Sequence, residues 1–310
     1  MPSAIANGAR IRTNTSAENA YNALDAANKS IAVRQLRLST GKRINSASDD
    51  VSGYITSRSL QSRVGTLKQA LTAVGDAQNV TNISTDGLDN ISNLITQIKD
   101  AASSAASGSL GTDEKVALAK SAYRLTQQIQ TVVDSTVFGG QQLLAGSFSA
   151  EFVIASNSSN SLLTLAVDLT TGNSDFNLAG SNGFNTGITS TNFAGVSGLN
   201  LSSLNSVTSS ALGIFSSTQI QTTLTSLSNA LDNVNKVAAY LGGVTNRLDS
   251  QSTALNSQIT NYNAAISRIE DADVAKEQLE LVRAQFLQQA SIVSLTQANQ
   301  APSTFLSLFR

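Results

Sequence analysis

The sequence of 310 residues contains no cysteine, no histidine and no tryptophan, and it has only two prolines and one methionine. Without cysteine the chain can form no disulfide and offers no thiolate as a nucleophile or zinc ligand. Without histidine it lacks the commonest general base and the usual ligand of transition metals. Serine, lysine and carboxylate side chains could still catalyse, but this composition favours a protein that is not an enzyme and uses no cofactor.

The charges are nearly balanced, with 20 basic and 21 acidic residues spread along the chain. This distribution gives no basic patch of the kind that binds nucleic acid. No apolar run approaches the roughly 18 residues that a membrane span requires. The first residues also lack the apolar core of a cleaved signal peptide. We therefore expect no nucleic-acid partner and no membrane segment, in a protein that is either cytoplasmic or exported by another route.

The C-terminal third carries the clearest periodic pattern. Its apolar side chains alternate at spacings of three and four residues, which is typical of a helix in a coiled coil. Gly242 and Gly243 lie within this run and could mark a bend, because each glycine costs a helix about 1 kcal/mol. The positions are Leu224, Leu227, Leu231, Val234, Ala238, Leu241, Thr245, Leu248, Ser252, Leu255, Ile259, Tyr262, Ile266 and Ile269.

The first half repeats this spacing in two runs, from Leu60 to Val74 and from Leu88 to Ala105. A turn follows, with Thr112 as the expected N-cap of a further helix that ends near Ser135. Beyond it the sequence becomes rich in Ser, Asn, Gly and Thr, and two short β-like runs predict a hairpin around residues 150–170. The chain is thus predicted to be mainly α, a long antiparallel coiled coil or helical bundle with a small β-hairpin.

The two ends of the chain carry apolar side chains on several helix faces. One chain has little means of burying all of them, and large exposed apolar surface marks an interface. The alternative for each residue is a core between the terminal helices of a single chain. We assign to subunit contact the residues Leu24, Ile31, Leu38, Leu279, Val282, Phe286, Leu295, Phe305, Leu306, Leu308 and Phe309.

Two short acidic runs, RINSASDD at residues 43–50 and RIEDAD at residues 268–273, could serve as an acid–base pair or an oxygen-ligand metal site. Helix starts explain them better. Ser46 or Ser48 can cap a helix, and aspartates are favoured at the positive end of a helix dipole.

The segment RLSTGKRINSASDDVSGY (37–54) resembles the N-terminal signature of bacterial flagellins. Residues 267–310 resemble their C-terminal signature almost throughout, and FGGQQLLAGS (138–147) resembles the end of their conserved N-terminal part. The resemblance covers roughly residues 1–150 and 220–310. It implies an inner, filament-core domain in which the two chain ends pair as a coiled coil.

In detail, the resemblance implies that residues 1–47 and 271–310 form the inner domain. Residues 48–190 and 205–270 would form a helical rod domain, with a short variable surface region at about 171–210. The two acidic runs would then meet at an inter-domain joint, where we hypothesise a salt link between an arginine of one run and a carboxylate of the other. The joint residues are Arg43, Asp49, Asp50, Arg268, Asp271 and Asp273.

The implied function is structural: a subunit that polymerises with itself into the extracellular bacterial flagellar filament, for motility. The implied partners are the flagellar export apparatus, an export chaperone, and the cap and hook-associated proteins, with export that needs no cleaved signal peptide. The nearest alternative is a hook–filament junction protein of the same family. A coiled-coil adhesin or secretion translocator is another, whereas a hydrolase inside a flagellin scaffold would need a His-Glu-x-x-His insert that this chain lacks.

Enteric flagellins carry the sequence LQRVREL, which contacts the vertebrate Toll-like receptor for flagellin, and the matching stretch here is ITQIKDA at residues 95–101. Gln97 replaces the arginine, Ala101 replaces the following leucine, and Ser121 replaces a glutamate on the next helix. The loss of a central arginine typically costs an interface about 2 kcal/mol or more. We therefore expect weak or absent receptor activation.

Overall fold

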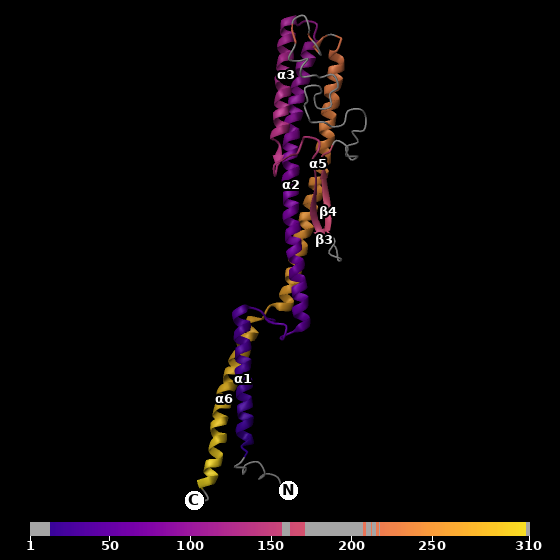
Figure 1. Ribbon diagram of the computed structural model, residues 1–310. Coiled ribbons are helices and arrows are strands. Elements are labelled where there is room, and N and C mark those ends of the chain that lie inside the picture. Colours follow the sequence, from indigo (N-terminus) through magenta and orange to yellow (C-terminus); the bar gives the residue numbers. More distant parts are fainter. Residues whose placement is uncertain are drawn as a thin grey trace. The chain divides into compact units, whose positions relative to one another are not determined.

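The computed structural model describes residues 13–156, 162–170, 207–208, 212, 215–216 and 218–307. This part of the chain is mainly helical, with two small antiparallel hairpins (Figure 1). The elements are α1 (Thr15–Thr40), α2 (Val51–Ala106), α3 (Thr112–Ser135), β1 (Val137–Phe138), β2 (Gln141–Gln142), β3 (Ser149–Ser156), β4 (Leu162–Asp168), α5 (Ile220–Glu270) and α6 (Val274–Ser307).

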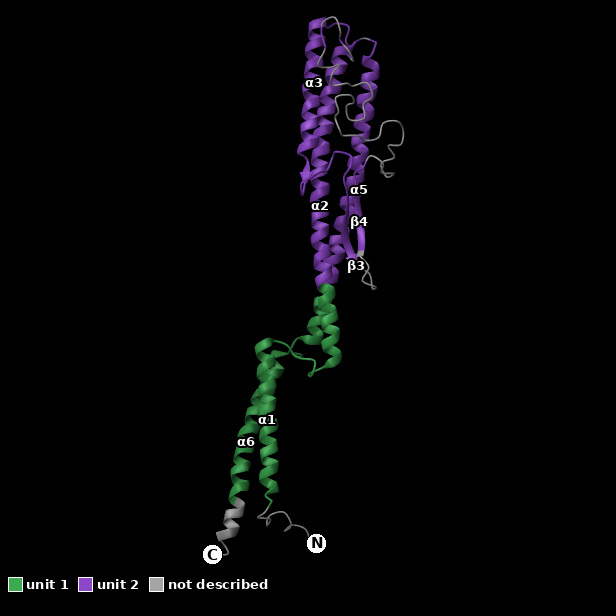
Figure 2. Ribbon diagram, viewed as in Figure 1, with its two compact units in different colours: residues 1–64, 260–310 green, residues 65–259 purple. Residues whose placement is uncertain are grey.

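The chain divides into two compact units, coloured separately in Figure 2. Unit 1 combines residues 1–64 with residues 260–310, and unit 2 spans residues 65–259. Unit 1 therefore contains α1, α6, the beginning of α2 and the end of α5. The fold class predicted from the sequence is confirmed, including the pairing of the terminal helices. The predicted domain bounds at residues 47 and 271 stay a prediction.

Unit 2 is built on three helices, α2, α3 and α5, which lie side by side (Figure 1). The sequence indicated two separate apolar runs on α2, but the structure has one helix of 56 residues. The gap between the runs is filled by Ala77, Thr81 and Ser84, all fully buried. The two hydroxyls donate to Gln78 and Val80 carbonyls of the same helix, which is why polar side chains can occupy the core.

The periodic run on α5 is helical throughout, and the helix continues through Gly242 and Gly243. The buried positions differ in part from those predicted. Thr223, Ala230, Val237 and Val244 are buried, whereas their predicted neighbours Leu224, Leu231, Ala238 and Thr245 are only half-buried. A helix that packs on several neighbours buries a wider face than the two-position seam of a coiled coil, and α5 has this wider face.

The predicted hairpin is present as β3 and β4, which pair antiparallel with a bulge at Ile154. It lies against α5, where Gln251 Nε2 donates to the Ile154 carbonyl at 2.9 Å. The predicted surface region at 171–210 lies almost wholly outside the described residues. The predicted cap of α3 was wrong: Gly111 is the N-cap, and Thr112 is the first helical residue.

Candidate functional site

The terminal helices α1 and α6 pack against each other in unit 1 and run antiparallel, side by side (Figure 1). Asn14 Nδ2 donates to the Ala298 carbonyl at 2.8 Å, near the two chain ends. Midway, Gln288 Nε2 donates to Asn28 Oδ1 at 2.7 Å. These contacts join residues more than 250 positions apart and define one register of the pair.

The seam between the two helices follows the three-and-four spacing of a coiled coil. Small side chains alternate there with larger apolar and polar ones, and few of them are fully buried. The positions on α1 are Ala17, Ala20, Leu24, Ala27, Ile31, Arg34 and Leu38, and those on α6 are Glu277, Leu281, Ala284, Gln288, Ser291, Leu295 and Ala298. Such a seam buries little apolar area, so the pair gains little stability from its own packing.

Glu277 is the charged member of the α6 seam and is buried. Arg34 Nη1 lies 2.7 Å from Glu277 Oε2, and Arg37 Nη1 lies 3.3 Å from Oε1. Burial by itself would raise the pKa of Glu277, but hydrogen bonds and charge from Arg34 and then Arg37 outweigh it and lower the pKa. The carboxylate therefore stays ionised inside the pair.

The outward faces of α1 and α6 expose large apolar side chains. On α6, Leu279 is 72% exposed, Phe286 67% and Val293 63%. On α1, Tyr21, Val33 and Leu36 are also exposed. A lone pair of helices gains nothing from these side chains in water, so this surface is a candidate contact for other molecules.

The residues assigned to subunit contact fall into two groups in the structure. Leu279, Val282 and Phe286 are exposed and available to a partner. Leu24, Ile31, Leu38 and Leu295 are half-buried in the seam, where the alternative of a core within one chain also applies. Phe305 and Leu306 belong to α6, but their side chains lie outside the described residues, as do Leu308 and Phe309.

A backbone crossing joins α1 to the end of α5 within unit 1. Gly41, at φ +70°, ends α1 in the left-handed conformation that glycine adopts most readily. Its carbonyl then accepts from Ala272 N, and Arg43 N donates to the Glu270 carbonyl at 2.6 Å. Lys42 and Asp271 form an antiparallel bridge between these two bonds.

Side chains reinforce this crossing around the buried Glu270. Lys42 Nζ lies 2.5 Å from Glu270 Oε1, and Gln61 Nε2 donates to Oε2 at 2.6 Å. The hypothesised salt link was wrong in its partners. Arg43 donates to the Ile269 carbonyl rather than to a carboxylate, and no ion pair of Arg268 occurs among the described residues.

The aspartates of the two acidic runs act as caps and turn acceptors. Asp50 Oδ1 accepts from Gly53 N at the start of α2, and Asp273 Oδ1 accepts from Lys276 N at the start of α6. Asp49 accepts from the backbone of Ser46 and Asn45, and these hydrogen bonds lower its pKa. The cap of α2 is thus an aspartate, not Ser46 or Ser48 as the sequence suggested.

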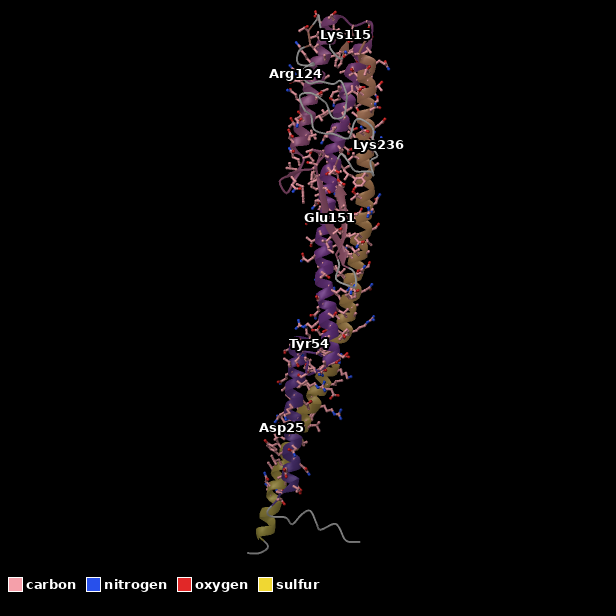
Figure 3. The ribbon with its side chains drawn as sticks, turned by 45° about the vertical axis from the view of Figure 1, so that its right-hand side comes forward. Asp25, Tyr54, Lys115, Arg124, Glu151 and Lys236 are labelled. Atoms are coloured by element: carbon pink, nitrogen blue, oxygen red, sulfur yellow. The ribbon has the colours of Figure 1, made fainter. Side chains whose placement is uncertain are left out.

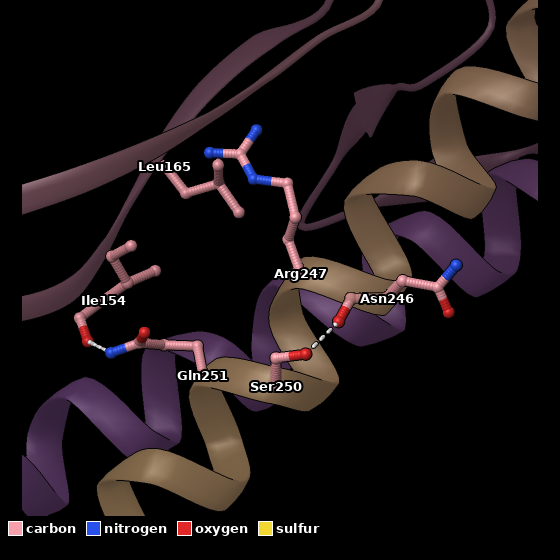
Figure 4. A pocket seen from close by; sticks show the side chains of 6 residues that line it. All are labelled: Ile154, Leu165, Asn246, Arg247, Ser250 and Gln251. Atoms are coloured by element: carbon pink, nitrogen blue, oxygen red, sulfur yellow. Dashed lines mark hydrogen bonds between the residues drawn. The ribbon is translucent and has the colours of Figure 1, made fainter.

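No helix in the described part of the chain is both long enough and apolar enough to cross a membrane. The same described residues contain no cluster of three carboxylates that could hold a metal ion. A groove of about 450 Å³ lies between the hairpin and α5 (Figure 4). It is lined by Ile154, Leu165, Asn246, Arg247, Ser250 and Gln251, which offer no carboxylate for acid–base chemistry.

The receptor-equivalent positions lie on the helices of unit 2. Gln97 on α2 and Ser121 on α3 are exposed, and Ala101 is half-buried. Charged side chains of this unit, such as Glu151 and Lys236, lie on its outside (Figure 3).

Sequence reasoning missed three polar residues that hold unit 1 together, Lys42, Gln61 and Glu277. It singled out Glu270 within the second acidic run but named no partner for it. Glu277 could have been found, because the three-and-four spacing runs unbroken from it through Leu281 to Ala298. Lys42 and Gln61 carry no local signal, since their contacts with Glu270 join distant parts of the chain.

Comparison with known proteins matches both ends of the chain to family models. The model of the bacterial flagellin N-terminal helical region matches residues 11–149, and that of the bacterial flagellin C-terminal helical region matches residues 224–309. Flagellin FlaB1 of Treponema pallidum is 28% identical over 97% of this chain and 99% of its own length. A flagellin of Bacillus subtilis is also 28% identical, over 97% of this chain and 100% of its own.

Among solved structures, a putative flagellar hook-associated protein from Vibrio parahaemolyticus matches with a TM-score of 0.56 and 14% identity. The match covers 72% of this chain and 100% of that one. At this identity the likeness shows a shared fold alone.

Proposed function

The chain belongs to the bacterial flagellin family, and we propose that it polymerises through the apolar faces that the α1–α6 pair leaves exposed. The protein is a structural subunit of the flagellar filament, which lies outside the cell. The exposure of Leu279, Phe286 and Val293 carries the proposal. Contacts between unlike patches, repeated by a rotation and rise that do not close, produce an open filament.

We assign the filament core to the paired terminal helices, residues 1–47 and 271–310. Residues 48–190 and 205–270 would then form the rod domain, with a short variable surface region at about 171–210. The inter-domain joint would consist of Arg43, Asp49, Asp50, Arg268, Asp271 and Asp273. This division is supported by the acidic runs, which the structure uses to begin α2 and α6.

Substitution on the exposed face tests the proposed contact. Phe286→Ala removes a 67% exposed ring that a neighbouring subunit would bury, whereas Gln285→Ala changes the exposed amide next to it on the same helix. We expect filaments of Gln285→Ala and few or none of Phe286→Ala, with both chains soluble and equally helical. Negative-stain microscopy of sheared filaments measures this. Normal filaments of Phe286→Ala would refute the assignment.

Removal of residues 301–310 tests the apolar tail in the same way. We expect a soluble chain that does not polymerise, because Phe305, Leu306, Leu308 and Phe309 would be lost together. Sedimentation of the purified chain distinguishes monomer from polymer. Sedimenting filaments of the truncated chain would count against a role for the tail.

We propose that the subunit leaves the cell through the flagellar export apparatus, aided by an export chaperone and without a cleaved signal peptide. Once outside, it would add beneath the cap and above the hook-associated proteins. Membership of the flagellin family supports the proposal of these partners. Mass spectrometry of subunits from sheared filaments tests the export route, because a mass short of an N-terminal leader would contradict it.

A hook–filament junction protein is the second candidate. The structural likeness to a hook-associated protein favours it only at the level of the fold, since the identity is 14%. Curated flagellins, in contrast, match along almost the whole chain. We also propose that the chain has no catalytic role, because the family is structural and the chain has no histidine or cysteine.

A further inference from the structure

Helix α6 carries apolar side chains on two opposite sides. Leu279 and Leu281 lie two residues apart, hence about 200° around the helix. Leu281 is 9% exposed and faces α1, while Leu279 is 72% exposed. We call the outward face the outer stripe; it consists of Leu279, Val282, Phe286 and Val293, and all four are exposed.

Apolar burial alone would place the outer stripe against α1. The stripe offers two valines, a leucine and a phenylalanine. The face that α1 does cover offers mainly small or polar side chains, among them Ala284, Gln288 and Ser291. The hydrophobic effect is non-directional and grows with the apolar area that is buried. It should therefore favour packing of the outer stripe, which has the larger apolar area, against α1. Another interaction must therefore decide which side of α6 meets α1.

That interaction is present at the first turn of α6. Glu277 lies on the covered face and binds Arg34 at 2.7 Å and Arg37 at 3.3 Å, both from α1. Only 8% of the Glu277 side chain is exposed. If α6 turned by about half a revolution, Glu277 would leave both arginines and Leu279 would come to lie near Arg34. Arg34 would then be half-buried against an apolar surface without its anion, which is costly.

We propose that Glu277, through Arg34 and Arg37, selects the face of α6 that packs on α1 and so leaves the outer stripe uncovered. Glu277 is thus a positioning residue. The use of the outer stripe by neighbouring subunits rests on the proposed function. The choice of face does not, because it is a property of one chain.

The chain has no cysteine, so pairs of cysteines can be introduced without background. Asn28→Cys with Gln288→Cys reports the observed face, since these side chains touch. Asn28→Cys with Gln289→Cys reports the turned helix, because Gln289 is exposed and lies on the side of the outer stripe. A short thiol-reactive cross-linker is added to each purified chain. With Glu277 intact, the first pair should give most of the intramolecular product.

In the Glu277→Gln background we expect the ratio of the first product to the second to fall by about tenfold or more, as loss of a buried ion pair predicts. Glu277→Arg should lower it further, because three cations would then meet. Combining Glu277→Arg with Arg34→Glu and Arg37→Glu should restore the original ratio. Glu280→Gln is the matched control: it lies one turn away, with its side chain 38% exposed, and should change nothing.

An unchanged ratio in Glu277→Gln would overturn the proposal. So would a parent chain in which the first pair fails to cross-link, or a charge-swapped chain that does not recover. The filament assay separates this proposal from the proposed function. If the ratio shifts as expected but Phe286→Ala filaments are normal, the choice of face stands and the contact role of the outer stripe fails.

Discussion

Each polar residue of unit 1 has a structural role that its own contacts define. Glu270 binds Lys42 and Gln61, Asp50 caps the start of α2, and Glu277 binds two arginines. Removing one partner of such a buried set leaves the other without compensation, which is why single substitutions here should be measurable. The effect of each substitution on stability should be smaller where the residue is more exposed.

Acid should weaken the pairing of α1 with α6 through Glu277. Its pKa in the folded chain lies below the ordinary 4.5, so its contribution to stability is present above about pH 4.5 and is lost as the pH falls through the folded value. The protection of α1 and α6 amides, measured as hydrogen exchange relative to the intrinsic rate at each pH, should therefore fall in acid. In Glu277→Gln this protection should already be lower at neutral pH and should change less with acid. Equal acid dependence in both chains would contradict this.

Arg43 and Arg268, the arginines of the two acidic runs, can be compared by substitution. Arg43 donates to the Ile269 carbonyl at 2.6 Å, whereas Arg268 is exposed and makes no ion pair within the described residues. Arg43→Ala should lower the free energy of unfolding by about 1 kcal/mol, and Arg268→Ala by less than about 0.5 kcal/mol. Thermal unfolding of the purified chains, followed by circular dichroism, provides the measurement. If Arg43→Ala is as stable as wild type, the hydrogen bond from Arg43 makes no net contribution to the free energy of unfolding.

At the scale of elements, the helices were predictable from the sequence because their apolar spacing is regular over long runs. The continuity of α2 was not, since Thr81 and Ser84 look like a polar interruption unless their hydroxyls are known to bond within the helix. The prediction of buried positions on α5 was only partly correct, because one sequence does not reveal how many neighbours a helix has. The crossing at Gly41 depends on long-range pairing that no local pattern encodes.

Glycines within the long helices have opposite roles that substitution can separate. A Cβ at Gly243 of α5 would meet nothing within 4 Å, so Gly243→Ala should stabilise the chain by about 0.5–1 kcal/mol. A Cβ at Gly87 of α2 would lie 2.7 Å from Leu144 Cδ1. Gly87→Ala should therefore destabilise unit 2. Thermal unfolding followed by circular dichroism measures both, and the same sign for both would contradict this account.

For the molecule as a whole, the ends and the middle of the sequence present different surfaces. The terminal helices expose large apolar side chains, which we propose contact other subunits, while unit 2 exposes charged and polar side chains. The subunit contact through the chain ends stays a prediction. The family signatures did not predict which face of α6 stays open, because the more apolar face is the exposed one, and the contact of Glu277 with α1 is not encoded in either signature.

We propose that this chain activates the vertebrate Toll-like receptor for flagellin weakly or not at all, because Gln97, Ala101 and Ser121 replace the residues of enteric flagellins. Gln97 is exposed on α2, so Gln97→Arg can restore the cation without disturbing the core. The substitution should raise potency in a cell reporter assay by about tenfold or more. Thr96→Arg, which adds the same charge at the neighbouring exposed position, is the control. Enteric-like potency of the unmodified chain would refute the proposal.

The crossing at Lys42 and Glu270 joins segments that the ribosome makes at different times. These residues are 228 positions apart, so α1 is synthesised long before the segment that completes its pairing. At roughly 5–20 residues per second, a ribosome needs about ten to fifty seconds to reach it. Throughout that interval the first helix has no partner within its own chain. The terminal pair can therefore form only after nearly the whole chain has been made, and anything that binds the unpaired ends has this interval in which to do so.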